Sequence, residues 1–270
     1  MSYRADLHCH SNCSDGTFTP KELLHLAKEA GLDALSITDH DTLRSYCPSL
    51  FEEAKALGLA LFMGVEFSAR HHGTPIHLLG YGVAKEREIL AFCQEHQKRR
   101  HERNQAILKK LALKSILIEE EELGDPEEQT LGRPHIAKIL RSRKIVSSYQ
   151  EAFDRYLGEG KPCFDPGESF GVEETIEIIH RAGGKAFIAH PHLIRNQAVF
   201  KELLKMPFDG IECYSGRHPN KEKKWLLIAS QKNWLISGGS DFHGSSKPYI
   251  PLGCSWVGEE EVNRLFGDPG

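Results

Sequence analysis

Two histidines and an aspartate stand close together near the beginning of the chain, in the segment DLHCHSNCSDG. If this segment forms a strand, residues two apart point to the same face, so His8 and His10 project together while Cys9 points away. Paired imidazoles followed by a carboxylate, here Asp15, are typical ligands of a divalent metal ion. Such a histidine pair also occurs among hydrogen-bonded structural residues, so the pair alone does not establish a metal site.

The same residue types recur after further apolar segments of the chain. They lie in the motifs ITDHD, GVEFS, PIHLLGYG, AFIAHPH and ISGGSDFHG, and fifteen of the 270 residues are histidine. If the apolar segments are parallel strands of a barrel, their carboxyl ends meet at one mouth, where active sites form. We therefore expect one metal centre at this mouth, to which the motifs would contribute six more residues: His40, Glu66, His77, His190, Asp241 and His243.

The elements that would position these residues can be located from the pattern of apolar residues. Short apolar runs alternate with helical patterns, which predicts an α/β fold with a parallel sheet. Thr19 and Pro20 are typical of a helix start, and that helix would end at Gly31. About seven strands suit a closed or nearly closed barrel. The predicted strands are residues 4–8, 34–38, 59–66, 76–83, 185–190, 209–214 and 234–240, and further helices are expected before Gly58, at 172–183 and at 219–232.

Residues 84–171 interrupt this alternation, because they contain no convincing strand. They read as a long charged helix at 86–113 and two shorter helices in GRPHIAKILRSR and SSYQEAFDRYL. We expect residues 1–83 and 172–270 to form the barrel and residues 84–171 to form a helical insertion over one of its faces. Whether the insertion is a lid or a packing subdomain is left open. The basic run KRRHER at 98–103 is expected to be a solvated helix face, or else a guide for an oligonucleotide.

Composition limits the class of protein. Hydrophobic residues make up 40% and charged residues 27% of the chain, which is typical of a globular protein. The net charge of −4 argues against a broad basic surface for long nucleic acid. No apolar run is long enough for a signal peptide or a membrane span. The seven scattered cysteines indicate a reducing compartment, so we expect a cytoplasmic protein with no membrane partner.

Taken together, the motifs DLHCHSNCSDG, ITDHDT, GVEFS, HLLGYG, AHP and SDFHG resemble those of the polymerase and histidinol phosphatase (PHP) superfamily of metal-dependent phosphoesterases. The motifs GRPHIAKIL and YSGRHP are similar to those of its TrpH-like bacterial branch. This resemblance implies a distorted (βα)7 TIM-like barrel with a helical insertion. It also implies hydrolysis of nucleoside 3′,5′-bisphosphates, or of the 5′ ends of short oligonucleotides as a 5′-3′ exonuclease.

The resemblance further implies a trinuclear metal site holding two to three divalent ions. Mn²⁺ is favoured, and Fe²⁺ or Zn²⁺ also suits a mixed imidazole and carboxylate donor set. One ion would be held by His8, His10, Glu66 and Asp241; a second would share Glu66 with His77 and His190; a third would take Asp15, His40 and His243. Six positive charges against three carboxylates would favour a phosphate ester, attacked by a metal-bridging hydroxide without a covalent enzyme intermediate.

Candidate substrate-binding residues lie in the insertion and after the sixth predicted strand. Arg133 stands at a predicted helix start, where a guanidinium and the helix N-terminus together suit an anion, so we expect it to bind a substrate phosphate and act in catalysis. His135 and Lys161 are further candidates. Arg217 could complete a clamp for a second phosphate, and His218 could protonate the leaving oxygen. The alternative for Arg133 is a surface arginine beside a helix cap.

Other functions stay open at this point. The substrate could be another small phosphomonoester such as histidinol phosphate. An amidohydrolase can use a similar barrel mouth, but it usually needs a carboxylated lysine, for which we find no candidate. A module that binds metal without catalysis is a third reading. We expect a small phosphorylated partner, a nucleotide or short oligonucleotide, and no stable complex with long nucleic acid. The oligomeric state is left open.

Overall fold

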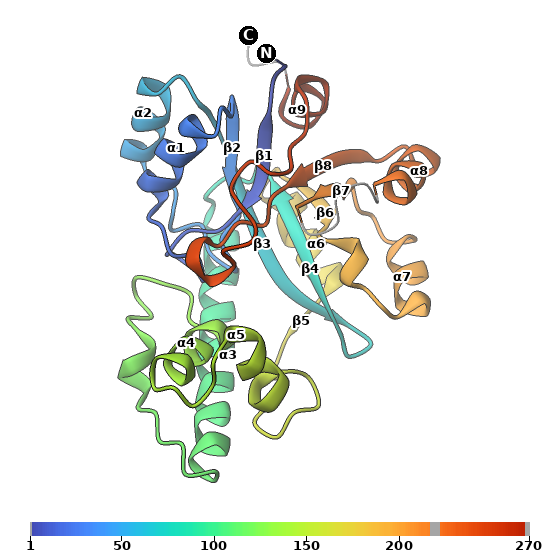
Figure 1. Cartoon of the computed structure of the whole chain (residues 1–270). Coiled ribbons are helices and arrows are strands. Elements are labelled where there is room, and N and C mark those ends of the chain that lie inside the picture. Colours follow the sequence, from blue (N-terminus) through green and yellow to red (C-terminus); the bar gives the residue numbers. More distant parts are fainter. Residues whose placement is uncertain (1, 217–221, 268–270) are drawn as a thin grey trace.

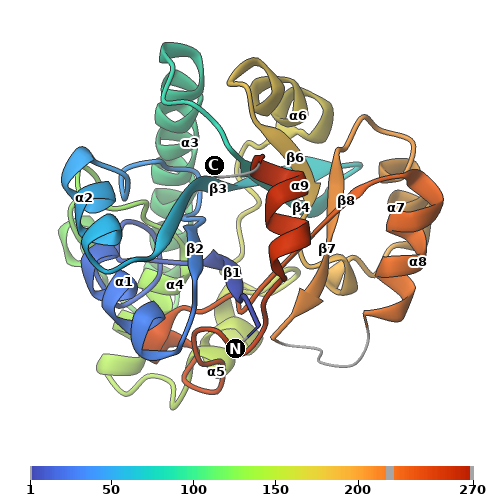
Figure 2. The same cartoon turned by 90° about the horizontal axis from the view of Figure 1, so that it is seen from above.

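A curved sheet at the centre of the molecule wraps into a nearly closed barrel (Figures 1 and 2). The structure is a computed structural model that describes residues 2–216 and 222–267. The ends of the sheet meet where the His10 N–H donates to the Phe242 carbonyl at 2.9 Å and the Asp241 N–H donates to the His8 carbonyl at 2.8 Å. Along the sheet the strands are β1 (Ala5–Cys9), β2 (Ala34–Ile37), β3 (Ala60–His71), β4 (Thr74–Tyr81), β6 (Lys185–Ile188), β7 (Gly210–Ser215) and β8 (Leu235–Gly239).

The predicted α/β barrel is confirmed, but the prediction that all its strands are parallel is wrong. Strand β4 runs antiparallel to both of its neighbours, β3 and β6. The cause is local: only His72 and Gly73 separate β3 from β4, and both have positive φ angles of 46° and 75°. A two-residue turn of this kind joins antiparallel strands, whereas parallel strands need a long crossover.

Helices surround the barrel on its outer side (Figure 2). The first, α1 (Pro20–Glu29), begins as predicted: the Thr19 hydroxyl accepts from the Glu22 N–H, and the Glu22 carboxylate accepts from the Thr19 N–H. Apolar side chains such as Ile37 and Val65 are fully buried beneath these helices. The others are α2 (Pro48–Ala56), α6 (Val172–Arg181), α7 (Gln197–Leu203), α8 (Lys223–Lys232) and α9 (Glu259–Phe266), with short 3-10 turns η3 (Pro191–Leu193) and η4 (Gly244–Ser246).

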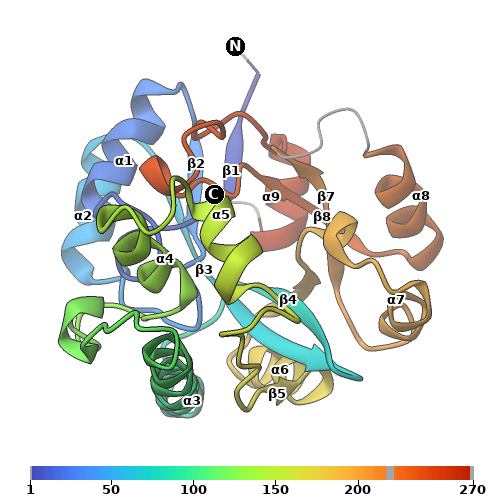
Figure 3. The ribbon, with the colours of Figure 1, turned by 60° about the horizontal axis from the view of Figure 1, so that its bottom comes forward.

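The segment between β4 and α6 is mostly helical and carries its own apolar cluster. Ile107, Ile136 and Leu140 are completely buried in it. Helices α4 and α5 lie across one end of the barrel (Figure 3). The segment contains α3 (Arg87–Ala112), the 3-10 turn η1 (Glu120–Leu123), α4 (Arg133–Ser142), α5 (Tyr149–Ala152) and the π-helical turn η2 (Phe153–Leu157).

One feature of this segment differs from the prediction. A two-residue strand, β5 (Phe170–Gly171), pairs in parallel with Ala69 and Arg70 of β3, so the chain rejoins the sheet before α6 begins. Two residues are too few to give an apolar pattern in the sequence. The division at residues 84 and 172 into barrel and insertion stays a prediction. Among the described residues, no helix has both the length and the apolar character that a membrane crossing requires.

Candidate metal centre

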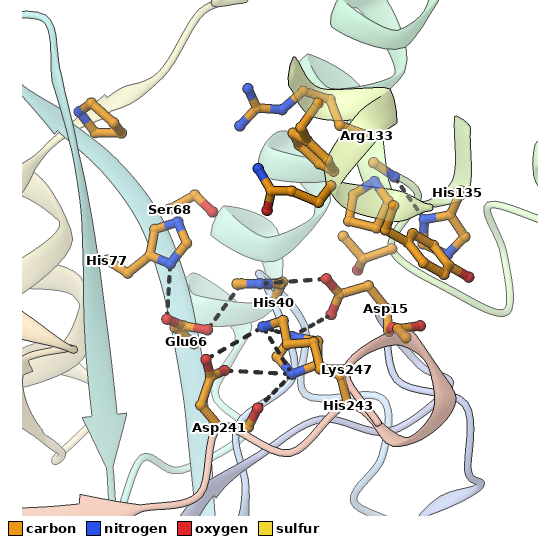
Figure 4. Close-up of a pocket in the computed structure, with 18 of the residues that line it drawn as sticks. Asp15, His40, Glu66, Ser68, His77, Arg133, His135, Asp241, His243 and Lys247 are labelled. Carbon is orange, nitrogen blue, oxygen red and sulfur yellow. Dashed lines mark hydrogen bonds and ion pairs between the residues drawn. The ribbon is translucent and has the colours of Figure 1, made fainter. Parts of the chain in front are cut away.

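Glu66 is the hub of a cluster of histidines at the barrel mouth. Its side chain is 1% exposed. One carboxylate oxygen, Oε1, lies 2.8 Å from Nδ1 of His77 and 2.8 Å from Nε2 of His190. The other, Oε2, lies 3.1 Å from Nδ1 of His40 (Figure 4). The same oxygen lies 3.2 Å from Nε2 of His10. Nε2 of His8 is 3.4 Å from the same oxygen. One buried carboxylate is therefore surrounded by five imidazoles.

Two further carboxylates extend the cluster. Oδ1 of Asp241 lies 3.5 Å from Nε2 of His10 and 3.7 Å from Nε2 of His8. Oδ1 of Asp15 lies 3.3 Å from Nε2 of His243, and its Oδ2 lies 3.9 Å from Nε2 of His40. The structure thus brings together all nine residues that the sequence motifs singled out as metal-ligating candidates.

Two of these residues reach the cluster in a way that differs from the prediction. Glu66 was expected at the end of its strand, but β3 continues for five residues beyond it, to His71. His77 lies in the middle of β4. Because β4 is antiparallel, its first half lies at the mouth where the neighbouring strands carry their carboxyl ends. The parallel-barrel argument for His77 was therefore wrong although the location was right.

The backbone at the mouth is strained at two of these positions. His190 and Asp241 have φ angles of +26° and +58°, in a region that residues with a Cβ rarely adopt. Strain of this kind costs about 1–3 kcal/mol and is concentrated at functional sites. His190 follows β6, and Asp241 follows β8, so both turns leave the sheet at the mouth and direct these side chains into the cluster.

The donor atoms of the cluster fit divalent cations. Several are inaccessible to water yet form no hydrogen bond within the described residues: Nε2 of His8, both ring nitrogens of His10, Oδ1 of Asp15, and Nδ1 of His40 and His190. Buried polar atoms are normally hydrogen-bonded, so this number of unpaired donors in one place indicates a missing partner. Ligand atoms lie within 4.8 Å of one another in three groups: His8–His10–Glu66, His40–Glu66–His77 and His10–Asp15–His40–His243.

The electrostatics of the cluster keep Glu66 and Asp15 anionic and His40 neutral, whereas neighbouring carboxylates, against the effect of burial, raise the pKa of His8 well above its usual value and that of His10 to about 9. Burial opposes ionisation of Glu66, but His40, His77 and His8 hold the pKa of its carboxyl well below the usual range. Burial also opposes ionisation of Asp15, whose pKa is held low by His243 and His40. Burial lowers the pKa of His40 to about 3, against the opposing effect of the carboxylates. Anionic carboxylates and a neutral imidazole are the ligand forms that a metal ion requires.

Glu212 is a site residue that the sequence reasoning missed. It lies in β7, is 1% exposed, and its Oε1 is 2.8 Å from Nδ1 of His8. Its second oxygen accepts the N–H of His190 at 2.5 Å. A carboxylate behind a ligating histidine fixes the tautomer and orientation of the ring. The signal that could have found it is a single acidic residue inside the apolar strand GIECYS.

Lys247 is a second missed residue. Its Nζ lies 3.3 Å from Oδ2 of Asp241 and 3.0 Å from Nε2 of His243 (Figure 4). An ammonium group therefore stands at the edge of the cluster, beside the carboxylate of Asp241. Lys247 follows SDFHG by three residues, and no recognised motif marks it.

A cavity of about 740 Å³ opens onto the cluster, and its opposite side is basic. Five arginines line it: Arg70 from β3, Arg100 and Arg103 from α3, and Arg133 and Arg141 from α4. We call Arg70, Arg100, Arg103 and Arg133 the arginine wall. Figure 4 shows Arg133 and His135 across the cavity from Asp241 and His243. The expectation that the run KRRHER is a solvated face is wrong for Arg100 and Arg103, because α3 packs against the barrel and directs both toward the cavity.

The positive charges of the arginine wall exceed the negative charges of the carboxylates that lie beside it. Arg100 pairs with the buried carboxylate of Asp41 at 2.6 Å. Burial, together with Arg100 and Arg70, lowers the pKa of Arg133 to about 10. The pKa of Arg103 is held well below its usual range by burial and by Arg100 and Arg133, and its buried Nε forms no hydrogen bond within the described residues. Crowded, partly desolvated guanidinium groups of this kind suit an anionic ligand.

The remaining predicted substrate-binding residues are placed differently from one another. Arg133 and His135 line the cavity, and Nδ1 of His135 accepts the Gly132 N–H at 3.1 Å at the start of α4. Arg133 also lies over the rings of Phe153 and Phe164, so it is not a free surface arginine. Lys161 is exposed and does not line this cavity. Arg217 and His218 lie outside the described residues, and their roles stay predictions.

Comparison with known proteins gives consistent similarities. The family model described as the PHP domain matches residues 6–159. The 5′-3′ exoribonuclease Rnm of Escherichia coli (strain K12) is 33% identical over 278 residues, covering 98% of this chain and 94% of the relative. The 3′,5′-nucleoside bisphosphate phosphatase of Chromobacterium violaceum is 29% identical, covering 88% and 86%. The crystal structure of a candidate metal-dependent phosphoesterase from Bifidobacterium adolescentis has a TM-score of 0.88 at 27% identity, covering 97% and 94%.

Proposed function

The chain belongs to the PHP domain family, and from that premise we propose that it is a metal-dependent phosphoesterase that hydrolyses phosphate esters of nucleotides. The observation that carries the proposal is the position of the cavity. On one side lie nine imidazole and carboxylate side chains, and on the other lies the arginine wall. Five of the nine, His8, His10, Asp15, His40 and His190, have buried ring or carboxylate atoms that form no hydrogen bond within the described residues. A nucleotide with two phosphates has one anionic group for each side.

The metal ligands in this proposal are those that the motifs indicate. One ion would be held by His8, His10, Glu66 and Asp241. A second ion would share Glu66 with the first and would also be held by His77 and His190. A third ion would be held by Asp15, His40 and His243. The distances around Glu66 and Asp15 support this division. When bound, divalent ions supply positive charge beside the phosphate oxygens and lower the pKa of water to near neutrality. We propose two to three ions, with Mn²⁺ favoured and Fe²⁺ or Zn²⁺ as alternatives, since the donors are imidazoles and carboxylates without a thiolate.

The protein's own groups would bind and orient the substrate. Arg133 and Arg103 would hold the phosphate that is not hydrolysed, because their guanidinium groups lack sufficient anionic partners in the wall. Glu212 would keep the ring of His8 and the backbone of His190 in place through its two oxygens. Arg217 as part of the second-phosphate clamp, His218 as the proton donor, and His135 and Lys161 as substrate contacts are retained as predictions.

The substrate class follows from this division of charge. We propose nucleoside 3′,5′-bisphosphates, or the 5′ ends of short oligonucleotides, since either presents a second phosphate near the one that is cleaved. The names of the Escherichia coli and Chromobacterium violaceum relatives support this class. A monophosphate such as histidinol phosphate would leave the arginine wall without an anion. All seven cysteines are unpaired, which supports a reducing compartment such as the cytoplasm.

The experiment is a substrate screen with Mn²⁺-loaded protein. Phosphate or nucleotide release would be measured from nucleoside 3′,5′-bisphosphates, nucleoside monophosphates, short oligonucleotides and histidinol phosphate, with amide substrates in parallel. We expect bisphosphates or oligonucleotides to have the highest kcat/KM. Glu66→Ala should lose activity. Glu53→Ala should retain it, because Glu53 forms an ion pair with His25 on the outer surface. Amide hydrolysis without phosphoester hydrolysis, or no release from any ester by metal-loaded protein, would refute the proposal.

A further inference from the structure

A second group of metal-binding side chains lies away from the candidate metal centre, at the tip of the β3–β4 hairpin. Oε2 of Glu202 lies 2.8 Å from Nε2 of His71 and 3.2 Å from Nε2 of His72. One ligand atom from each of these residues lies within 4.8 Å of the others. Figures 1 and 3 both show the hairpin tip beside α7, the helix that carries Glu202. Two imidazoles and one carboxylate thus converge from two elements far apart in sequence.

The backbone makes this convergence possible. Consecutive residues of a regular strand point to opposite faces, so His71 and His72 would diverge if the strand continued. His71 instead ends β3, and His72 adopts the left-handed conformation with φ +46°. The turn brings the two ring centroids within 4.3 Å. A residue other than glycine in this conformation costs about 1–2 kcal/mol, so the convergence is not the relaxed state of an ordinary strand end.

Exposure suits a site that exchanges ions with solvent. The two histidines differ in exposure: the side chain of His72 is 70% exposed, whereas that of His71, at the end of β3, is 12% exposed. The carboxylate of Glu202 is 45% exposed. An ion could therefore enter from solvent and keep water in its remaining coordination position.

We propose that His71, His72 and Glu202 form a second metal site, separate from the candidate metal centre, that binds a transition metal ion such as Zn²⁺. Two neutral imidazoles and a carboxylate, completed by water, form a donor set that Zn²⁺ accepts in tetrahedral geometry. Mg²⁺ and Ca²⁺ are disfavoured because they prefer oxygen ligands. The single negative charge of Glu202 would offset half the charge of the ion.

The ion would join the hairpin tip to α7. This matters for the barrel mouth because the same hairpin carries two residues of the candidate metal centre. Glu66 lies five residues before His71, and His77 lies five residues after His72. A link to α7 would limit movement of the tip and so of both strands. The proposal concerns metal binding and does not depend on phosphoesterase activity, so it can fail or succeed independently of the proposed function.

The test measures zinc bound per chain by equilibrium dialysis and elemental analysis, using full-length protein stripped with a chelator. Wild type is compared with His72→Ala and Glu202→Gln. The matched control is His25→Ala, which removes a surface histidine from a single pair with Glu53 at 2.8 Å. We expect each site variant to bind about one zinc ion fewer than wild type, and the control to bind as many as wild type. Equal zinc content in all four proteins would overturn the proposal.

A local readout separates loss of the site from loss of fold. Circular dichroism and thermal unfolding without metal should be the same for wild type and His72→Ala, because His72 is exposed at the turn. Hydrogen–deuterium exchange of residues 71–74 and 197–204 should slow when zinc is added to wild type and stay unchanged in Glu202→Gln. Equal slowing in the two proteins would contradict the assignment, since the ion would then bind elsewhere.

Discussion

Glu212 bridges two residues of the candidate metal centre: its Oε1 lies 2.8 Å from Nδ1 of His8, and its other oxygen accepts the N–H of His190 at 2.5 Å. Burial opposes a charge on the His8 ring, but the carboxylates of Glu212 and Glu66 raise its pKa well above the usual value. The pair of contacts fixes the ring of His8 and the strained backbone of His190 together. A buried carboxylate outside the ligand set thus controls the geometry of residues from β1 and the end of β6.

Glu212→Gln is expected to weaken metal binding while leaving the fold intact. The amide keeps the shape of the side chain but removes the charge that holds the His8 ring, and loss of such a carboxylate typically costs 10–100-fold in metal affinity or activity. Mn²⁺ affinity and kcat with a nucleotide substrate would be measured. Glu53→Gln is the matched control, because Glu53 also lies 2.8 Å from a histidine nitrogen but on the surface. Equal effects of the two substitutions would show that Glu212 has no special role.

Removing the metal is expected to destabilise the protein reversibly. Without cations several donor atoms near Glu66, among them Nε2 of His8 and both ring nitrogens of His10, are buried and form no hydrogen bond within the described residues. An ion that binds only the folded state adds about 2.7 kcal/mol at a free concentration of 100 times Kd. Thermal unfolding of chelator-treated protein should shift to higher temperature when Mn²⁺ is added. Glu66→Ala should show little or no shift. An unchanged Tm in wild type at saturating Mn²⁺ would contradict metal binding at this centre.

Arg133→Ala is expected to discriminate between substrates. A charged hydrogen bond contributes about 1.5–3 kcal/mol, so loss of the guanidinium should reduce kcat/KM for a 3′,5′-bisphosphate by about 10–100-fold. A nucleoside monophosphate, which has no second phosphate, should be affected much less. Steady-state kinetics on both substrates measure the ratio. An equal loss of kcat/KM for the two substrates would exclude the proposed second-phosphate clamp.

Arg103→Met is expected to stabilise the protein and impair its activity. Arg103 is surrounded by Arg100 and Arg133, and burial holds its pKa low, so replacing the charge with an apolar side chain of similar length should add about 1 kcal/mol to the free energy of unfolding. Activity on bisphosphates should fall. Urea unfolding measures the change in the free energy of unfolding, and steady-state kinetics measure the change in activity. The control is Arg181→Met, since Arg181 forms exposed pairs with Glu88 and Glu177. A less stable Arg103→Met protein would contradict the repulsion within the arginine wall.

His96 should make the stability of the protein depend on pH. Its ring packs against Phe67, Phe92 and Phe170, and burial lowers its pKa to about 4. In the unfolded chain His96 takes up a proton below about pH 6.5, whereas in the folded protein it does so only near its lowered pKa. The contribution of His96 to the free energy of unfolding is therefore fully present above about pH 6.5 and is lost as the pH falls toward about 4. Between pH 7 and 5 this loss amounts to about 2 kcal/mol.

His96→Phe is the corresponding test, because it keeps an aromatic ring in the pocket and removes the titrating group. Urea unfolding at pH 7 and pH 5, with chelator present, should show a smaller loss of stability in the variant than in wild type. The metal-ligating candidates titrate in both proteins, so their effect on the pH dependence of stability cancels when the two proteins are compared. Parallel pH dependence in the two proteins would contradict a lowered pKa for His96.

Much of the barrel could be predicted because its signals are local. Thr19 and Pro20 mark a helix start, and each apolar run either contains a histidine or a carboxylate or is followed directly by one. The direction of β4 could not be predicted from its apolar pattern, since that pattern is the same in both directions. Only the shortness of the turn at His72 and Gly73 determines it.

The missed residues have a different cause. Glu212 acts through a contact with His8, which is far away in sequence, so nothing near Glu212 in the chain indicates that contact. Lys247 contacts Asp241 and His243, which are near it in sequence, but no recognised motif marks the turn η4 that brings it back to them. Within the arginine wall, Arg133 was predicted, whereas Arg100 and Arg103 were missed because a basic run on a helix looks solvated unless the partner surface is known. Here Asp41, which follows β2, pairs with Arg100 and so helps to hold the helix face against the barrel.

The antiparallel hairpin makes the metal centre sensitive to strand slippage. Ser68 pairs with His77, which places His77 diagonally opposite Glu66 and within reach of its carboxylate. Side chains alternate between the two faces of a strand, so a slip of one residue would turn His77 to the other face. A single-residue insertion or deletion in the tight turn would therefore disrupt the candidate metal centre without unfolding the barrel. Length variation among homologous hairpins should accordingly occur in steps of two residues.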